Sequence, residues 1–348
     1  MQRAGPEEPS PPCPVCGERK TATMLRRFSV DAAAEHFVPS KRLPARNRQL
    51  KSVLLQLWKG RDFVEVRRCE ACGFAFASPF VAGNPDFYNL VSGQDPHYPR
   101  HRWEFDLTLR SLRYFTRTGT RVRLIEAGAG DGWFLRQLTN SSIGHLFDVL
   151  ALEYDEGALR SLRKAGFRAE RGSITSLADK SDAIGAFHVI CLFQTLEHMD
   201  NIHEAFETFR SIGAPGGHVY LSVPYGPSIW AQEELVRLWD MPPNHIGRWN
   251  PNAFKYLADQ YGLTVVDQEI EPYSWPHEPW RLALYKVNGE AYDVSSLAGR
   301  VQAINSRLVR GVLKRVLALL WFPLMTASGP RTSGHSQWVH LRLPTNNA

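Results

Sequence analysis

The chain has 348 residues, of which 43% are hydrophobic, so it can form one large domain and a smaller one and is not intrinsically disordered. Its formal net charge of +6 is mild, and this permits a nucleic-acid or acidic-lipid partner without indicating either. The start of the chain is polar and proline-rich, and the apolar stretch at 316–325 is shorter than the roughly 20 residues of a membrane span, so we expect a cytoplasmic protein.

Four of the five cysteines form two C-x-x-C-G pairs, Cys13/Cys16 and Cys69/Cys72. Two such hooks are typical of a tetrahedral zinc site, and four cysteine ligands favour a structural role over a catalytic one. Two local disulfides are the first alternative, which the absence of a secretion signal disfavours. A redox motif is the second, which the duplication disfavours. Cys191 lies in the apolar run "FHVICLF" and is predicted to be a buried core thiol.

The segment between the cysteine pairs contains an apolar helical pattern. In "LKSVLLQLW", Leu50, Val53, Leu54 and Leu57 fall on one helical face. We expect this helix to pack on the zinc knuckles, which predicts a small zinc-ribbon-like N-terminal module over residues 1–85.

A glycine-rich loop follows at "LIEAGAGDGWF". The run before it reads as a buried strand and "DGWFLRQL" as the start of a helix. Trp133 stands where the third glycine of G-x-G-x-x-G would fall, which disfavours a nicotinamide or flavin enzyme. Glu126 at the end of the strand would repel a pyrophosphate and would suit a cationic ligand.

This E-x-G-x-G-x-G pattern resembles motif I of the class I S-adenosylmethionine (SAM) methyltransferases. Further segments resemble that family in the expected order: "DVLALEYDEGAL" the second strand, "AERGSITSL" the third, "AFHVICLFQTLEHM" the fourth and "APGGHVYLSVP" the fifth. The paired cysteines followed by "GFAFASPF" are similar to bacterial methyltransferases with a zinc-binding N-terminal region. The resemblance implies an α/β, Rossmann-like fold with a seven-stranded mixed sheet over residues 86–348.

The resemblance also implies which residues bind the cofactor. The methionine part of SAM would lie against the motif I loop, the ribose on the acid that ends the second strand, the adenine at the following loop, and the sulfonium near the end of the fourth strand, where glutamine replaces a common acid. In that order, the residues are Glu126, Gly128, Gly130 and Gly132; Glu153 with Tyr154; Ser173 and Ile174; and Gln194.

The segment "DPHYPRHRWEFD" precedes the first strand of this domain. In the resembled fold it corresponds to a lid over SAM, where Tyr98 and Trp103 could face the sulfonium by a cation–π contact. The alternative is that Trp103 begins an amphipathic helix and packs in the core. Both interpretations stay open at this point.

Two histidines are candidates for a catalytic base, because a histidine near its ordinary pKa can accept a proton from a hydroxyl or carbon acid. His198 ends "QTLEH", and His245 lies in "MPPNHIGRW", which resembles a P-P-H-H loop of related methyltransferases. Either could instead be a packing or loop-fixing residue, and some methyltransferases use no base. Asn250 before Pro251 predicts a helix over about 251–261.

The last strands are predicted in "LTVVDQEIEPY" and "HSQWVHLRLP", as an antiparallel sixth and seventh. Between them, residues 274–333 form an insertion with helical spacing. Its apolar and basic residues could cover the sheet, form a homodimer, or touch a membrane surface.

We therefore expect a SAM-dependent methyltransferase with a structural zinc ion, acting on an oxygen or carbon of a small biosynthetic intermediate. One alternative is an RNA methyltransferase that grips nucleic acid with the zinc module, but the fourth strand ends in "FQTLEH" and has neither the N/D-P-P-Y of amino-methylating enzymes nor a Pro-Cys nucleophile there. Another is a non-catalytic scaffold, which the intact acid and glycine loop disfavour.

Overall fold

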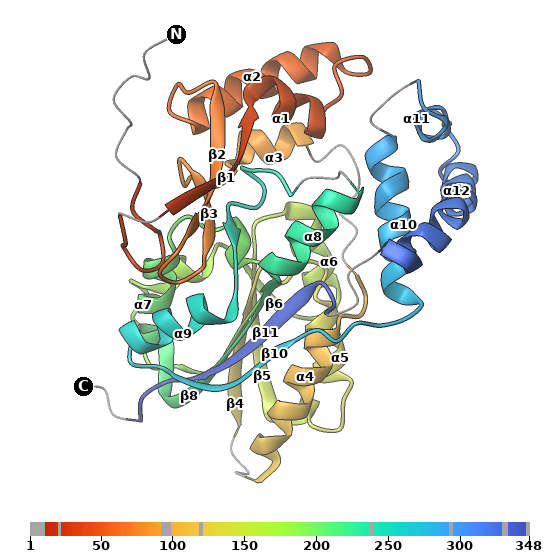
Figure 1. Cartoon of the computed structure of the whole chain (residues 1–348). Coiled ribbons are helices and arrows are strands. Elements are labelled where there is room, and N and C mark those ends of the chain that lie inside the picture. Colours follow the sequence, from red (N-terminus) through yellow and green to blue (C-terminus); the bar gives the residue numbers. More distant parts are fainter. Residues whose placement is uncertain are drawn as a thin grey trace.

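The structure is a computed structural model. It describes residues 11–19, 22–91, 99–117, 121–236, 240–291, 295–328 and 333–345. Figure 1 shows two sheets stacked along the molecule, with a group of helices at one side.

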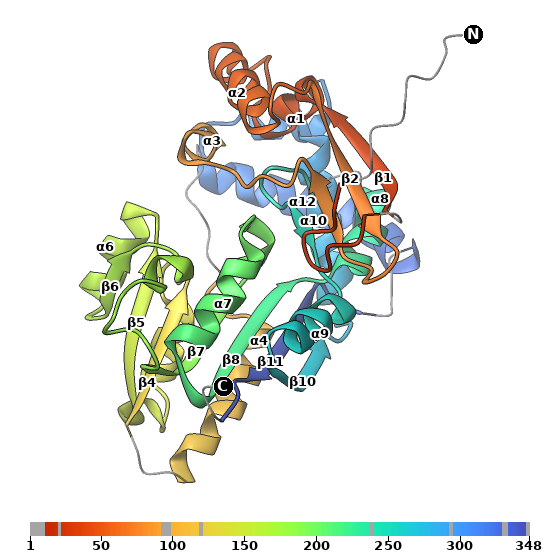
Figure 2. The same cartoon turned by 90° about the vertical axis from the view of Figure 1, so that its left-hand side faces the viewer.

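The larger sheet confirms the predicted Rossmann-like fold with seven strands (Figure 2). Its strands run in the order β10-β11-β8-β7-β4-β5-β6. Six of them run in one direction, and β11 runs in the opposite direction. In chain order they are β4 (Val122–Ala127), β5 (Phe147–Glu153), β6 (Arg168–Arg171), β7 (Phe187–Phe193), β8 (Gly213–Pro224), β10 (Thr264–Ile270) and β11 (Ser336–Arg342).

Helices cover both faces of this sheet, and each face has its own apolar core. One face is covered by α4 (Trp103–Leu112), α5 (Trp133–Thr139) and α6 (Glu156–Lys164), and the other by α7 (Ile202–Ile212) and α9 (Pro251–Gln260). The central strand β7 is buried along nearly its whole length, as expected for a parallel strand covered on both sides. Cys191 lies in this strand and is fully buried, as predicted.

Helix boundaries follow capping signals in the sequence. Asn250 accepts a hydrogen bond from the backbone of Ala253 at 3.1 Å, so α9 begins at Pro251 as predicted. Asp155 caps α6 in the same way through Ala158, at 2.7 Å. These caps fix where each helix begins, and therefore where the loop before it ends.

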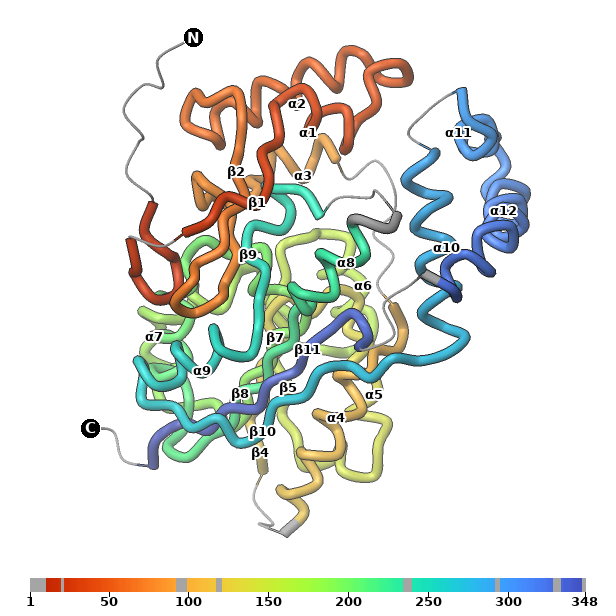
Figure 3. The backbone as a smooth tube through the Cα atoms, in the orientation of Figure 1, coloured from red at the N-terminus to blue at the C-terminus, as the bar shows by residue number. Residues whose placement is uncertain are grey.

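The smaller sheet is antiparallel, in the order β1-β2-β3-β9. Its first three strands come from the N-terminal region: β1 (Ala22–Ser29), β2 (Phe63–Cys69) and β3 (Ala75–Ser78). Its fourth, β9 (Gly247–Arg248), comes from the loop before α9. Phe74 beside β3 contacts Trp249, with ring centroids 4.9 Å apart. The two sheets therefore share a continuous core. Figure 3 shows β9 beside the strands of the N-terminal region.

The helix predicted between the cysteine pairs is α2 (Pro44–Leu57), and its apolar face is the predicted one. Leu50, Leu54 and Leu57 are buried. The expectation that this helix packs on the zinc knuckles was wrong. It packs instead with α1 (Val30–Phe37), α3 (Pro85–Val91) and Ile246 in a cluster that contains none of the cysteines, because the knuckles extend toward α9.

The insertion between β10 and β11 is helical, as predicted. It consists of α10 (His277–Glu290), α11 (Leu297–Gln302) and α12 (Arg307–Ser328), which share a small core of their own. Helix α10 also packs on α8 (Gly226–Val236). None of the helices in the part of the chain that is described is both long and apolar enough to cross a membrane.

Candidate functional site

The carboxyl ends of β4, β5 and β7 meet where the strand order of the larger sheet reverses, which is where α/β proteins bind ligands. Gly128, Gly130 and Gly132 follow β4, all with positive φ. A Cβ on Gly128 would lie 2.4 Å from the hydroxyl oxygen of Thr195 in the loop after β7. The glycine loop is thus tightly packed against that second loop.

Glu153 ends β5 beside the glycine loop. Its Oε2 accepts a hydrogen bond from the Gly130 N–H at 2.7 Å, and its Oε1 accepts from the N–H groups of Tyr154 and Asp155 at 2.7 and 3.1 Å. A carboxylate has about four lone-pair positions, so these three bonds leave room for a further donor. The predicted ribose-binding acid is therefore held in place by main-chain groups.

Glu126 lies in β4 and is 3% exposed. Burial, and after it the nearby Glu153, raises the pKa of Glu126 well above its ordinary value. Its Oε2 has no hydrogen-bond partner among the described residues. An orphaned buried oxygen of this kind fits a donor supplied by a ligand.

Gln194 follows β7 with φ +53, which is unusual for a residue other than glycine. Its Nε2 donates to Glu104 Oε1 at 3.1 Å, and Ser222 Oγ donates to the same oxygen at 3.2 Å. Glu104 lies in α4 and is 2% exposed. Helix α4 thus places a buried carboxylate, that of Glu104, against the side chain of Gln194.

The other predicted cofactor residues lie around this edge with different exposure. The Tyr154 side chain is 60% exposed, whereas Ile174 is buried at 1% and contributes its side chain to the core. Ser173 hydrogen-bonds Thr175 through the two hydroxyls at 2.8 Å. Trp103 is partly buried and packs on the core, as its alternative interpretation predicted. Tyr98 lies outside the described residues.

The two predicted histidines lie together. Their ring centroids are 4.5 Å apart, and Glu197 lies with them, each of the three offering an atom within 4.8 Å of the others. His198 Nδ1 donates to the Asn244 carbonyl at 2.7 Å, which leaves Nε2 as an acceptor. His245 Nδ1 lies 2.6 Å from the Asp240 carboxylate. These donors have the chemistry to exchange a proton or to hold a cation.

The surroundings give these groups different proton affinities. Burial, and after it His245, lowers the pKa of His198 to about 3, whereas burial raises the pKa of Glu197 to about 7. Burial alone would lower the pKa of His245, but Asp240 and Glu197 raise it above its ordinary value. The pKa of Asp240 falls to about 2, because His245 outweighs the effect of burial. His245 is therefore the stronger base.

Comparisons with known proteins agree with this geometry. Residues 98–268 match the model of a family described as a methyltransferase domain. These residues therefore form a methyltransferase domain. The seven-stranded mixed sheet is the one that the motif resemblance implied, and its last two strands, β10 and β11, pair antiparallel to each other. No curated protein matches the chain.

Solved structures similar to the chain include three methyltransferases. A SAM-dependent methyltransferase from Archaeoglobus fulgidus is 16% identical, with 68% of this chain and 94% of that one covered and a TM-score of 0.43. A phosphoethanolamine N-methyltransferase from Haemonchus contortus is 16% identical, with 68% and 52% covered and a TM-score of 0.42. A third, from Mesorhizobium loti, is 15% identical, with 68% and 99% covered and a TM-score of 0.40.

The methyltransferase domain contains functional candidates that sequence patterns did not reveal. Glu104 reaches Gln194 from a distant part of the sequence, and Asp240 lies five residues before its partner His245. Tyr88 of α3 places its hydroxyl 3.4 Å from His198 Nδ1. The loop over residues 240–248, which contains His245 and is called the histidine loop below, is fixed by a buried ion pair. Arg248 donates to Glu233 at 2.8 and 3.0 Å and to the Asp240 carbonyl at 2.7 Å.

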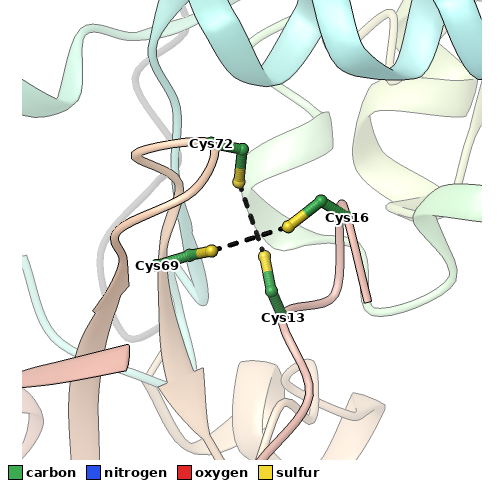
Figure 4. Close-up of side chains that lie close together, drawn as sticks. All are labelled: Cys13, Cys16, Cys69 and Cys72. Carbon is green, nitrogen blue, oxygen red and sulfur yellow. Dashed lines mark hydrogen bonds between the residues drawn. The ribbon is translucent and has the colours of Figure 1, made fainter. Parts of the chain in front are cut away.

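The four cysteines of the two hooks converge on one point (Figure 4). The Sγ atoms of Cys13 and Cys72 are 3.6 Å apart, and those of Cys16 and Cys69 are 3.5 Å apart. All four are free thiols, so the alternative of two local disulfides is not what the structure shows. Tetrahedral zinc–sulfur bonds of about 2.3 Å would place the sulfurs about 3.8 Å apart, so the donor set fits zinc.

The Asp240–His245 pair predicts a pH-dependent stability. Because the pKa of Asp240 is lowered from 3.8 to about 2, its stabilisation is present above pH 3.8 and is lost as pH falls toward 2. Because the pKa of His245 is raised, its stabilisation is complete below pH 6.5 and is lost as pH rises through the raised value. Both contributions are present between pH 3.8 and pH 6.5. We expect Asp240→Asn to lower the free energy of unfolding by about 3 kcal/mol in this pH range and by less at higher pH.

Denaturant unfolding of both proteins across this pH range measures the difference. Asp31→Asn is the control, because Asp31 pairs with Lys51 at an exposed position and should change stability by less than about 1 kcal/mol at every pH. A destabilisation by Asp240→Asn that stays constant from acid to alkaline pH would contradict the assignment.

Proposed function

We propose that the chain is an enzyme that transfers a methyl group from SAM to an oxygen or carbon of a small biosynthetic intermediate. One observation carries this proposal: the loop after β7 contacts both halves of the site. Thr195 in this loop packs against Gly128 of the glycine loop. Glu197 and His198, two and three residues after Thr195, lie beside His245. A cofactor loop and a group of proton-exchanging side chains are thereby adjacent.

The residues around the glycine loop fit SAM. The orphaned Oε2 of Glu126 can accept from the ammonium of its methionine part, and the Glu153 carboxylate has acceptor capacity left for ribose hydroxyls. SAM supplies a methyl group on a positively charged sulfur. We assign the glycines to the methionine part, Tyr154, Ser173 and Ile174 to the ribose and adenine side, Gln194 to the sulfonium side, and Tyr98 to the lid, whereas Trp103 packs on the core.

His245 is the better candidate for the base. A proton acceptor works best when its pKa lies near the working pH, and the pKa of His198 is too low at about 3. The Asp240 carboxylate, 2.6 Å from His245 Nδ1, stabilises the imidazolium that forms when His245 takes up a proton. His198, fixed by the Asn244 carbonyl, would position the acceptor.

The cofactor assignment predicts that the protein binds S-adenosylhomocysteine and that Glu153→Ala weakens this binding at least roughly tenfold, because hydrogen bonds to a charged group are lost. Calorimetric titration measures both affinities. Glu156→Ala is a matched control, because Glu156 is an exposed acid three residues away that pairs with Arg171. Equal affinities for the wild type and Glu153→Ala would contradict the assignment, as would absence of binding by the folded wild type.

The base assignment predicts the pH dependence of transfer. In a screen of hydroxylated and carbon-acid metabolites with methyl-labelled SAM, the rate should rise as pH increases through a pKa above 6.5, because His245 must be unprotonated. His245→Asn should lower the rate by roughly a hundredfold or more and leave S-adenosylhomocysteine affinity unchanged. His203→Asn, in α7, is the control. Retention of the rate by His245→Asn and its loss in His198→Asn would reverse the two roles.

We also propose that the four cysteines bind one structural zinc ion. Cys69 and Cys72 lie in the turn that joins β2 to β3, and β3 pairs with β9 of the histidine loop. Zinc at this position would hold the β2–β3 hairpin in shape, and through it the segment that carries His245. All four ligand positions are filled by thiolates, so the ion has no open position for chemistry.

The zinc proposal predicts one zinc ion per chain, measured by elemental analysis of the purified protein. The double variant Cys69→Ser/Cys72→Ser should contain none, whereas Cys191→Ala should retain it because Cys191 lies in β7. Removing zinc with a chelator should lower the melting temperature and speed hydrogen exchange in β9. Full zinc content in the double variant, or an unchanged melting temperature after chelation, would count against the proposal.

A further inference from the structure

One face of α12 exposes only apolar side chains. Leu308 is 78% exposed, Leu320 72% and Leu319 59%, and large contiguous apolar patches are uncommon on monomeric proteins. Further residues extend the same face at spacings of three or four: Val309, Val312, Val316 and Leu324. The opposite face is buried against α10 through Ala318 and Met325. This exposed stripe runs along nearly the whole helix.

Helix α12 lies at the outer edge of the molecule, as Figure 1 shows. The insertion leaves the larger sheet after β10 and returns to it at β11. Ile270 at the end of β10 pairs with Gln337, and Ser336 at the start of β11 pairs with Pro224 at the carboxyl end of β8. The helices therefore rise from the same edge of the sheet that carries the glycine loop and Glu153.

Helices α11 and α12 carry only cationic charges. Residues 297–328 contain five arginines or lysines and no aspartate or glutamate, and no acid follows to the end of the sequence. These residues are Arg300, Arg307, Arg310, Lys314 and Arg315. An amphipathic helix with this combination of an apolar stripe and basic flanks is typical of a segment that lies in the headgroup region of an anionic bilayer.

A second copy of the chain would fit this surface less well. Two copies related by a two-fold axis would bring the basic residues of α12 close to the same residues of the partner, with no acid on either helix to pair with them. Anionic lipid headgroups instead supply opposite charge over the whole surface. Charge complementarity therefore favours a membrane.

A hollow beside the stripe adds to this argument. It has a volume of about 260 Å³ and opens between α10 and α12, and Trp275 next to it in the sequence is 66% exposed. Tryptophan is enriched where proteins meet the membrane interface. The residues that line the hollow are predominantly apolar: Pro276, His277, Trp280, Leu319 and Phe322.

We propose that α12 docks this protein onto an anionic lipid bilayer, with its leucine and valine stripe inserted at the boundary between headgroups and acyl chains. The helix lies in the plane of the surface and does not cross it. Docking turns the carboxyl edge of the larger sheet toward the membrane. If the proposed function holds, the methyl acceptor is then an amphiphile that resides in that membrane.

Flotation of the full-length, zinc-containing protein with lipid vesicles tests the docking without any acceptor. We expect binding to phosphatidylcholine vesicles that contain one quarter phosphatidylglycerol, weaker binding to pure phosphatidylcholine, and partial release by high salt. Leu308→Ser/Leu320→Ser should weaken binding at least roughly tenfold, because two exposed apolar anchors are lost. Ile184→Ser is the matched control, since Ile184 is 59% exposed but precedes β7 at the opposite edge of the sheet.

Melting curves establish that the variants fold, and Arg315→Gln provides a second variant with the stripe intact, expected to weaken binding only to the anionic vesicles. The proposal is overturned if the wild type does not float, or if the folded double leucine variant floats as well as the wild type. A wild-type dimer that the leucine substitutions convert to a monomer, without vesicle binding, would also overturn it and would identify the stripe as a subunit interface. Because S-adenosylhomocysteine binding is measured separately, failure of docking is distinguishable from failure of the proposed function.

Discussion

The pairing of β3 with β9 is the constraint on which the rest of the site depends. Only two residues on each strand take part, Ala75 with Arg248 and Phe76 with Gly247. Arg248 is at the same time the buried partner of Glu233 and of the Asp240 carbonyl. One arginine thus joins the cysteine-bearing hairpin, helix α8 and the histidine loop. Losing either partner of such a buried pair leaves an uncompensated charge, which costs more than the pair itself contributes.

Neighbouring charges, and not residue type or burial alone, separate the roles of the groups at the site. Glu197, His198 and His245 lie within a few ångströms of one another, yet the pKa of one histidine falls to about 3, the other rises, and that of the glutamate reaches about 7. The difference follows from which side chain has a carboxylate beside it. Asp240 lies 2.6 Å from His245 Nδ1 and acts less strongly on His198, and environments that push proton affinities apart are typical of acid–base sites.

The sequence predicted those features that depend on local patterns. The strand and helix order, the glycine loop, the Asn250 cap and the convergence of the four cysteines all follow from short stretches with a clear physical signal. Features made by distant contacts were not predictable. Glu104 meets Gln194 across 90 positions of sequence, β9 is too short to show a strand pattern, and the packing of α2 depends on where the hairpin turns. Tertiary geometry decides these.

The origin of β9 also determines the order in which the molecule can be assembled. Its partner strand β3 lies about 170 residues earlier in the chain, so the smaller sheet stays incomplete until most of the methyltransferase domain has left the ribosome. The four cysteines, in contrast, are all present once the first 72 residues are made. Metal capture can therefore precede completion of the sheet. Zinc would then protect an early intermediate whose strand edge is still open to pairing with other chains.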